Sequence, residues 1–275
     1  MDRMTILVVS YDGYSDVWPG LFASLRRFWP DCPYEIVLAN NEKDLANNAV
    51  RVIHAGADAQ WSTRTRIALE QIETKYVCFL LEDFFFSGKV DAERIESAMD
   101  LMEKDGLEYY KLLSFSKIKT KLYDRDDVLQ VIPAGLPYGV SLLAAIWERE
   151  AFLRMIGDGD YNPWLFEARR IEEAKTAVDK QRLLGVYDPT NPLRICHMIV
   201  QGKYLPNAVR TMGAAGIAVD LSSRPVLRGG EYFKYKLKRM GSSLSTRLPF
   251  VGDLARKLGF ESVSARNLKQ SGEGS

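Results

Sequence analysis

Short apolar runs alternate with helical patterns along the first 90 residues, and this alternation constrains the fold more than any other feature. Strand-length apolar runs occupy 5–10, 35–39 and 50–54, and helical spacing of apolar residues follows between 16 and 29. We expect Ser62 to cap a helix that runs to about Glu73, and a further strand at 108–115. The run Tyr76–Leu81 is apolar throughout, which is typical of a strand buried on both faces. Strands and helices that alternate at this spacing form βαβ units, so we predict an α/β fold whose central sheet is mostly parallel and flanked by helices.

The composition places the chain among soluble globular proteins. Of its 275 residues, 47% are hydrophobic and 27% are charged, which argues against a disordered, fibrous or integral membrane protein. The three cysteines are widely spaced and form no CxxC pair, so we expect reduced thiols in a cytosolic compartment. The first apolar run is too short for a signal peptide. We therefore predict a cytoplasmic protein.

Polar side chains follow three of the expected strands. The residues directly after the first, second and buried strands include Ser10, Tyr11 and Asp12, then Asn40, then Glu82 and Asp83. Ligands of open parallel sheets bind beyond the carboxyl ends of the strands, so we expect these side chains to line one crevice if the strands are neighbours. No GxGxxG follows the first strand and no GxxxxGK[ST] occurs, which argues against a dinucleotide site and a P-loop.

Glu82 and Asp83 form the most informative pair. Two carboxylates at the end of a hydrophobic strand are costly to place unless a cation meets them. A divalent metal that carries a diphosphate satisfies this need, because Mg²⁺ and Mn²⁺ bind one or two carboxylates together with phosphate oxygens. The alternative is an acid that caps the next turn or faces solvent.

Three segments resemble a known family when they are taken together. They are 61–69, which contains Trp-Ser-Thr-Arg and Ala-Leu, 76–84, and Pro163–Glu167. Their pattern is similar to that of GT-A-fold glycosyltransferases, in particular the family 2-like enzymes of bacterial surface-polysaccharide synthesis. The resemblance covers roughly residues 5–215. It departs from the family at Leu81, which stands where the first Asp of the D-x-D motif is expected.

The resemblance implies a nucleotide-sugar donor and a divalent metal, Mn²⁺ or Mg²⁺. Asp83 occupies the position of the acid that usually binds the metal, with Glu82 beside it, and His197 matches a late histidine that several such enzymes place on the metal. The missing first Asp leaves metal dependence open. His197 also fits a buried structural histidine.

The same resemblance assigns the other donor contacts. Tyr11 would stack on the nucleobase, with Ser10 next to it and Asp12 or Asn40 on the edge of the base. A fixed positive charge near the diphosphate stabilises the leaving nucleotide, and the candidates for it are Arg64 and Lys203. Tyr11 equally suits partial burial at the rim of the sheet, and Arg64 equally suits a solvated helix face. Arg66 is the alternative to Arg64 as the residue that contacts the diphosphate.

Glu167 is the candidate general base. A sugar hydroxyl that attacks the anomeric carbon must lose its proton, and a carboxylate near the acceptor can take it. Trp164 lies three residues earlier, on the same helical face, and could stack on a sugar ring. Glu167 also suits the acid-rich first turns of a helix, and Asp158 and Asp160 are rivals for the role. A retaining mechanism would need no such base.

The expected organisation is a GT-A-like domain over 1–223 and a basic tail over 224–275. The domain divides into a nucleotide-binding half, 1–90, and an acceptor half, 91–223. The tail holds eleven Lys and Arg against four Asp and Glu, and its segment 231–239 interleaves aromatic with basic residues. Such a helix suits an anionic membrane surface, so we expect a peripheral location at the inner face of the cytoplasmic membrane; the alternative is a solvated basic helix. The acidic remainder argues against nucleic acid as a partner.

The sequence thus predicts a glycosyltransferase that moves a sugar onto a glycan or lipid-linked saccharide. A sugar nucleotidylyltransferase is weaker, because 10–14 holds a single glycine and no basic residue. A non-catalytic glycan-binding or assembly protein on the same scaffold stays open, because the first Asp of D-x-D is missing.

Overall fold

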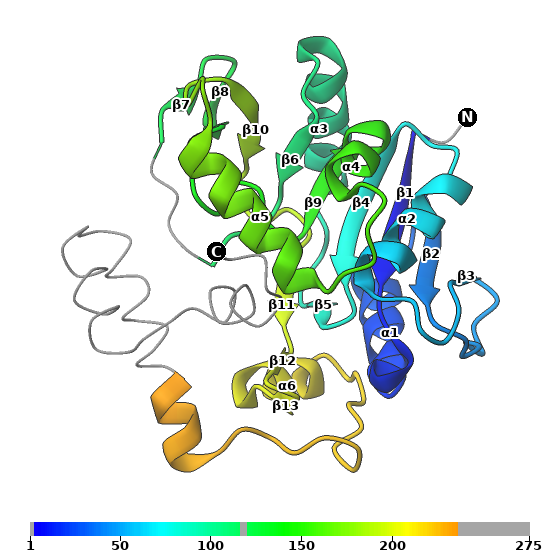
Figure 1. Ribbon diagram of the computed structural model, residues 1–275. Helices are drawn as coiled ribbons and strands as arrows, with labels where there is room; N and C mark the ends of the chain where they lie inside the picture. The colour runs from blue at the N-terminus through cyan, green and yellow to red at the C-terminus, as the bar shows by residue number, and fades with distance from the viewer. Residues whose placement is uncertain (1–2, 116–119, 236–275) are drawn as a thin grey trace.

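A central sheet of nine strands organises the protein, in the order β3-β2-β1-β4-β9-β6-β10-β8-β7 (Figure 1). The structure is a computed structural model and describes residues 3–115 and 120–235. The strands of this sheet are β1 Met4–Val9, β2 Glu35–Asn40, β3 Arg51–His54, β4 Tyr76–Leu81, β6 Tyr109–Lys111, β7 Leu122–Tyr123, β8 Asp126–Pro133, β9 Ala145–Glu148 and β10 Leu183–Tyr187.

Seven of the nine strands run in the same direction. The other two, β9 and β8, run the opposite way, and each is antiparallel to the strands on both of its sides. The four parallel strands β3-β2-β1-β4 have the order of a nucleotide-binding half of a doubly wound sheet. The α/β fold with a mostly parallel central sheet flanked by helices is confirmed.

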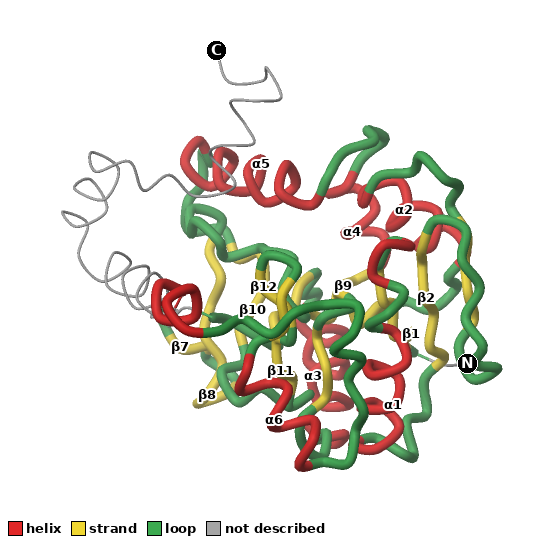
Figure 2. Tube along the Cα trace, turned by 90° about the horizontal axis from the view of Figure 1, so that it is seen from below, coloured by secondary structure: helices red, strands yellow, loops and turns green. Residues whose placement is uncertain are grey.

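Helices cover both faces of the sheet, and the alternation of side chains along β1 explains why. Ile6 and Val8 belong to the core under α1 and α3, whereas Leu7 and Val9 belong to the core under α2, α4 and α5. Figure 2 shows these two sets of helices on opposite sides of the strands. The helices are α1 Trp18–Phe28, α2 Trp61–Gln71, α3 Ala92–Asp105, α4 Arg149–Ile156, α5 Pro163–Thr176 and α6 Pro206–Ala214, with a 3₁₀ turn η1 at Asp12–Tyr14.

Two small strand pairs extend the edge where β4 ends. β5 (Phe84–Phe86) follows β4 almost directly and pairs antiparallel with β11 (Ile195–His197). The next two strands, β12 (Ile199–Val200) and β13 (Lys203–Tyr204), form a hairpin. A chain segment late in the sequence is thereby placed against the carboxyl end of β4.

Several local expectations differ from the structure. Helix α3 was not expected, and β6 covers only part of the strand expected at 108–115. Ser62 was expected to cap α2, but the helix begins at Trp61 and the Ser62 hydroxyl instead bonds to the backbone at Gly159 and Tyr161 (2.9 and 2.7 Å). This contact ties α2 to the loop before α5.

The domain limits stay a prediction. Residues just after position 223 nevertheless contact the body: Leu227 is 5% exposed, and its backbone N–H donates to Tyr204 at 2.8 Å. A helix is described over 229–235, which includes the start of the expected basic helix. The rest of the predicted tail, 236–275, lies outside the described residues. Within the described ranges, no helix is both long enough and apolar enough to cross a bilayer.

Candidate functional site

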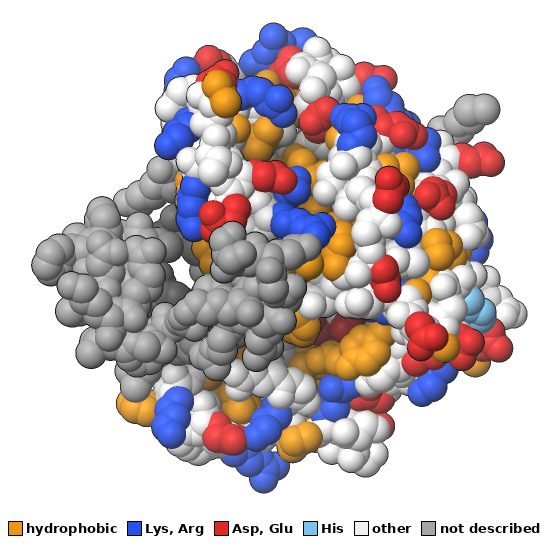
Figure 3. Space-filling model, in the orientation of Figure 1, with side chains coloured by type: hydrophobic (Ala, Val, Ile, Leu, Met, Phe, Trp, Pro, Cys, Tyr) orange, Lys and Arg blue, Asp and Glu red, His pale blue; other side chains and the backbone are white. Residues whose placement is uncertain are grey.

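The loops that follow β2, β1 and β4 lie along one edge of the sheet, because these strands are adjacent and parallel. The structure therefore brings together the polar segments 10–12, 40–41 and 82–83. In Figure 3 a recessed acidic surface borders hydrophobic side chains on the face that carries this edge. The edge is the candidate ligand site.

Asp83 and His197 form the centre of this site. The Nε2 atom of His197 lies 2.8 Å from Oδ2 of Asp83, and the two side chains are 24% and 14% exposed. The other carboxylate oxygen of Asp83, Oδ1, is buried and has no hydrogen-bond partner among the described residues. The backbone of Asp83 is held by the N–H of Met198, which donates to its carbonyl at 2.8 Å. A carboxylate oxygen without a partner thus lies beside an imidazole nitrogen.

This pair suits a divalent cation. Across residues 3–115 and 120–235, no cluster of three or more His, Cys, Asp or Glu side chains could hold a metal by itself. Asp83 and His197 supply two donors, so a cation here would take its remaining ligands from phosphate oxygens and water. The unpartnered Oδ1 of Asp83 is the observation in favour of such a fit.

Glu82 lies next to this pair and is partly exposed. Burial raises the pKa of Glu82, and so does the charge of Asp83, whereas the guanidinium groups of Arg64 and Arg224 lower it. Two cations from distant parts of the chain therefore act on the acidic end of β4.

Arg64 comes from the first turn of α2 and is largely buried. Its Nη1 donates to the carbonyl of Ala59, while its Nε is buried without a hydrogen-bond partner in the described part of the chain. Burial lowers the pKa of Arg64, and the charge of Glu82 raises it. The guanidinium carbon lies 6.0 Å from the ring centroid of Tyr11. Arg64 therefore has donor capacity left beside the acidic pair.

Arg66, the alternative to Arg64 as the residue that contacts the diphosphate, bonds instead to the loop before α5. Its Nη1 donates to the carbonyls of Gly157 and Gly159 at 3.1 and 3.4 Å. Asp160, a rival of Glu167 as the base, accepts a hydrogen bond from the backbone N–H of Gln60 at 3.0 Å. Both side chains hold the loop before α5 against α2.

Tyr11 is the exposed residue of the first loop, with 44% of its surface accessible, and its ring lies 5.1 Å from that of Tyr14. It is free to stack on a ligand.

Ser10, Asp12 and Asn40 build the loops beneath Tyr11. Ser10 accepts a hydrogen bond from the indole of Trp18 at 2.8 Å, and Asn40 donates to the carbonyl of Lys43 at 2.6 Å. Both side chains are almost wholly buried. The carboxylate of Asp12 accepts from the backbone N–H groups after β2, including that of Lys43 at 3.3 Å. The structure thus uses Asp12 to join the two loops, whereas Ser10 and Asn40 contact residues close to them in the chain. Oδ1 of Asn40 is buried and has no hydrogen-bond partner among the described residues.

Asn41, the neighbour of Asn40, fixes a second loop. Its Nδ2 donates to the carbonyls of Gly56, Ala57 and Ala59 at 2.9, 3.0 and 3.1 Å. An open hollow of about 470 Å³ lies on this loop, lined by residues 55–59, Thr63 and Asp160.

Glu167 lies farther along the sheet, in the half of the protein expected to bind the acceptor. Its carboxylate accepts from the backbone N–H of Leu142 at 3.2 Å. Burial raises the pKa of Glu167, while that hydrogen bond and the charge of Lys111 lower it. Lys111 is only 1% exposed, and burial lowers its pKa to about 8. Trp164 is 47% exposed on the first turn of the same helix, so an open aromatic ring lies one turn from Glu167.

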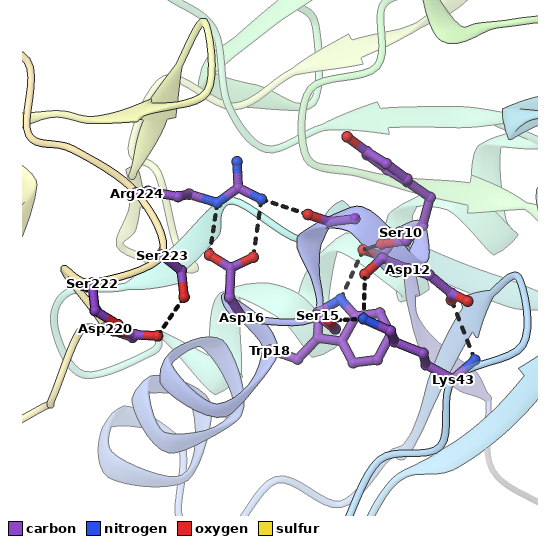
Figure 4. A network of polar contacts seen from close by, with 12 residues as sticks. Ser10, Asp12, Ser15, Asp16, Trp18, Lys43, Asp220, Ser222, Ser223 and Arg224 are labelled. Atoms are coloured by element: carbon purple, nitrogen blue, oxygen red, sulfur yellow. Dashed lines mark hydrogen bonds and ion pairs between the residues drawn. The ribbon is translucent and has the colours of Figure 1, made fainter.

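Lys203 and Arg224 differ from expectation. Lys203, a candidate phosphate ligand, forms an ion pair with Glu231 at 2.8 Å. Arg224, which had been counted with the basic tail, reaches the edge of the sheet and forms an ion pair with Asp16 (Figure 4). No local pattern distinguishes Arg224 from the other basic residues of the tail, so only the tertiary contact reveals it.

Comparison with known proteins finds a distant relative in sequence. No protein-family model matches the chain. A segment of 91 residues is 29% identical to mouse (Mus musculus) beta-1,4 N-acetylgalactosaminyltransferase 2. The segment covers 32% of this chain and 17% of that protein. The chain thus resembles a glycosyltransferase over about a third of its length.

Several solved structures are similar to the chain at low identity. TarS from S. aureus in complex with UDP-GlcNAc is 15% identical, with a TM-score of 0.39 over 94% of this chain and 76% of that one. A cytidylyltransferase from Leptospira borgpetersenii is 14% identical, with a TM-score of 0.42 over 66% and 74%. At these values the residues of the site have to be judged by their own geometry.

Proposed function

We propose that this protein is a glycosyltransferase that transfers a sugar from a nucleotide-sugar donor to a glycan or lipid-linked saccharide acceptor. The arrangement of Asp83 carries the proposal: its carboxylate follows a buried strand and pairs with His197, and its Oδ1 has no partner among the described residues. Such a carboxylate suits a cation that brings a diphosphate with it. The 91-residue similarity to a mammalian glycosyltransferase is in accord with this function.

Asp83 and His197 would hold the Mn²⁺ or Mg²⁺, with Glu82 beside them. The metal would neutralise the charge that develops on the leaving diphosphate. Arg64 supports the same task, because its buried Nε has no partner in the described chain. A fixed guanidinium stabilises a developing phosphate charge without having to reorganise during the reaction.

Tyr11 would hold the nucleoside. Its ring is exposed at the mouth of the site and lies near Arg64, so a base that stacks on the ring places its phosphates toward the arginine. The roles of Ser10, Asp12 and Asn40 in this proposal are indirect: they fix the loops that present Tyr11.

Glu167 would take the proton of the attacking hydroxyl if the reaction inverts the sugar. Burial favours its protonated form, so the carboxylate is a stronger base than an exposed glutamate. Trp164 offers an aromatic face one turn away, which suits the apolar face of a sugar ring. A role in surface-polysaccharide synthesis, at an anionic membrane, is the wider context that we propose.

Thermal unfolding in the presence of nucleotides tests the donor site. UDP, GDP, CMP and dTDP, each with and without Mn²⁺, are compared for the wild type, Asp83→Asn and the exposed control Asp127→Asn. A ligand at about 100 times its dissociation constant stabilises the native state by about 2.7 kcal/mol. We expect one nucleotide to stabilise the wild type and the control in a metal-dependent way, and Asp83→Asn to lose the effect. Stabilisation by none of them would contradict the proposal.

Measurements of turnover distinguish a glycosyltransferase from the other two candidate functions. Release of free sugar from the donor is a side reaction that we expect of a transferase. Nucleotide binding without hydrolysis or transfer would indicate a non-catalytic glycan-binding protein. Pyrophosphate release from a nucleoside triphosphate and a sugar phosphate would indicate a nucleotidylyltransferase instead.

A further inference from the structure

Arg224 is held in a fixed position against the loop after β1 (Figure 4). Its Nε and Nη2 atoms lie 2.7 and 2.9 Å from the carboxylate of Asp16, and Nη2 also donates to the carbonyl of Gly13 at 2.7 Å. The guanidinium carbon lies 3.8 Å from the ring centroid of Tyr14. Three hydrogen bonds and one aromatic ring therefore define the plane of the group.

The backbone around Arg224 is equally well fixed. Before it, the carboxylate of Asp220 accepts hydrogen bonds from Ser222 and Ser223 and closes a turn. After it, residues 225–227 run beside Tyr204, whose N–H donates to Pro225 at 2.9 Å. The position of Arg224 is therefore a built feature of the folded body.

One nitrogen of the Arg224 guanidinium, Nη1, takes no part in these contacts. Nη1 makes no hydrogen bond or ion pair to the described residues, and Figure 4 shows it directed away from Asp16. Tyr14, which packs under the group, also feels the acidic end of β4: burial raises the pKa of Tyr14 to about 12, Glu82 and Asp83 raise it, and Arg224 lowers it. The ring of Tyr14 lies 5.1 Å from that of Tyr11, so Arg224 and Arg64 flank the same pair of rings at the edge of the sheet.

We propose that Arg224 binds the second phosphate of a nucleoside diphosphate, which is the one farther from the nucleoside. This inference rests on the proposed function and deepens it. Arg64 lies beside Tyr11, on the nucleoside side of the site, and meets the nearer phosphate. Arg224 lies over Tyr14 and meets the second phosphate through Nη1, while Asp16 and Gly13 hold the remainder of its guanidinium. The site therefore selects a nucleoside diphosphate over the monophosphate of the same nucleoside.

Calorimetric titration of Arg224→Gln tests this assignment. The probes are the nucleoside diphosphate that stabilises the wild type and its monophosphate, both with Mn²⁺. Hydrogen bonds to charged groups contribute about 1.5–3 kcal/mol, so we expect the variant to lose about tenfold to 100-fold in affinity for the diphosphate and less than about threefold for the monophosphate. Arg224→Lys, which keeps the charge but not the fork, should lie between the two. Arg228→Gln, an exposed arginine of the same segment, serves as the control and should bind like the wild type.

Four outcomes overturn the assignment. Unchanged diphosphate affinity in a folded Arg224→Gln protein removes it, and so does an equal loss for both nucleotides, which would indicate a structural role alone. If Arg224→Gln does not fold, Arg224→Lys decides, because equal affinity losses for the two nucleotides in that variant would also overturn the assignment. If the wild type binds no nucleoside diphosphate, the proposed function fails together with this inference, whereas the first two outcomes leave that function intact.

Discussion

His197 lies within 2.8 Å of Asp83 because β11 pairs with β5 in a register that sets His197 opposite Phe84, the residue that follows Asp83. The rings of Phe84 and Phe115 both contact His197, with centroids 5.7 and 5.2 Å from the imidazole. A short strand pair and two aromatic rings thus orient one imidazole nitrogen toward a carboxylate.

Substitution of His197 by glutamine tests whether this pair binds metal. Glutamine keeps polar atoms at the site but removes the imidazole nitrogen. Loss of a group that orients or ligates a metal typically weakens metal binding about tenfold to 100-fold, so we expect at least that loss for Mn²⁺ in the presence of the bound nucleotide. Calorimetric titration of Mn²⁺ measures it. His54→Gln, which changes the other histidine, is the matched control, and equal affinities in the two variants would remove His197 from the metal site.

Tyr11→Ala tests the stacking of the base. Stacking on an aromatic side chain contributes about 1–3 kcal/mol per base, so we expect the affinity for the nucleotide to fall about fivefold to 150-fold. Tyr11→Phe should retain most of it, because the ring remains. Tyr11 is 44% exposed, so the melting temperature of the free protein should change little. Tyr138→Ala, a tyrosine of similar exposure in the other half of the chain, controls for nonspecific loss. Full affinity in Tyr11→Ala would place the base elsewhere.

The parallel half of the sheet and its polar edge could be predicted because their signals are local. An apolar run marks each strand, and the polar residue after it marks the end that faces a ligand. This reasoning selected Asp83 together with Ser10 and Asn40, which look the same in sequence. Their contacts differ in the structure, because Ser10 accepts a hydrogen bond from Trp18 and Asn40 donates one to Lys43, and such contacts are made only in the folded chain.

Arg224 shows why part of the site could not be predicted, and His197 was predicted only through the family resemblance. His197 reaches Asp83 through the pairing of β11 with β5, and Arg224 reaches Asp16 across most of the chain length. No periodicity encodes either contact. Helix α3 is a different case, because local signals were present: Asp91 caps its first turn and Gly106, at φ +63°, ends it.

Asp188 makes stability depend on pH. Burial raises its pKa, but the hydrogen bonds from Thr190, Arg94 and Tyr110 outweigh burial and leave the pKa of Asp188 below its ordinary value of 3.8. The unfolded state therefore binds the proton more readily, so this contribution is present above about pH 4 and is lost as the pH falls through the lower, folded pKa. We expect the free energy of unfolding, measured with urea, to decrease as the pH is lowered from about 5 to about 2, which is the range in which paired carboxylates take up their protons.

Asp188→Asn should reduce that slope and cost about 3–5 kcal/mol at pH 7, because Asp126 is then the one ionic partner left to Arg94 among the described residues, in a largely buried site. The exposed Asp127→Asn should change stability by less than about 0.5 kcal/mol and keep the wild-type slope. A variant at Asp188 with the same pH dependence as the wild type would show that other carboxylates control acid unfolding.

Glu167→Gln separates acceptor chemistry from donor binding. If Glu167 takes the proton of the attacking hydroxyl, its loss should lower the transfer rate about 100-fold to 10,000-fold while the dissociation constant of the nucleotide stays unchanged. Glutamine can still accept the hydrogen bond from Leu142, so the loop before β9 should keep its position. Transfer rates at saturating donor, together with nucleotide titration, measure the two quantities.

Glu172→Gln, on an exposed turn of the same helix, is the control for this substitution. The wild-type rate should fall at low pH as Glu167 becomes protonated, and burial moves that fall to a higher pH than an exposed glutamate would give. Glu167→Gln should lack this limb of the pH profile. A variant that transfers sugar at the wild-type rate would assign Glu167 a structural role beside Lys111 and favour a retaining mechanism, which needs no base at this position.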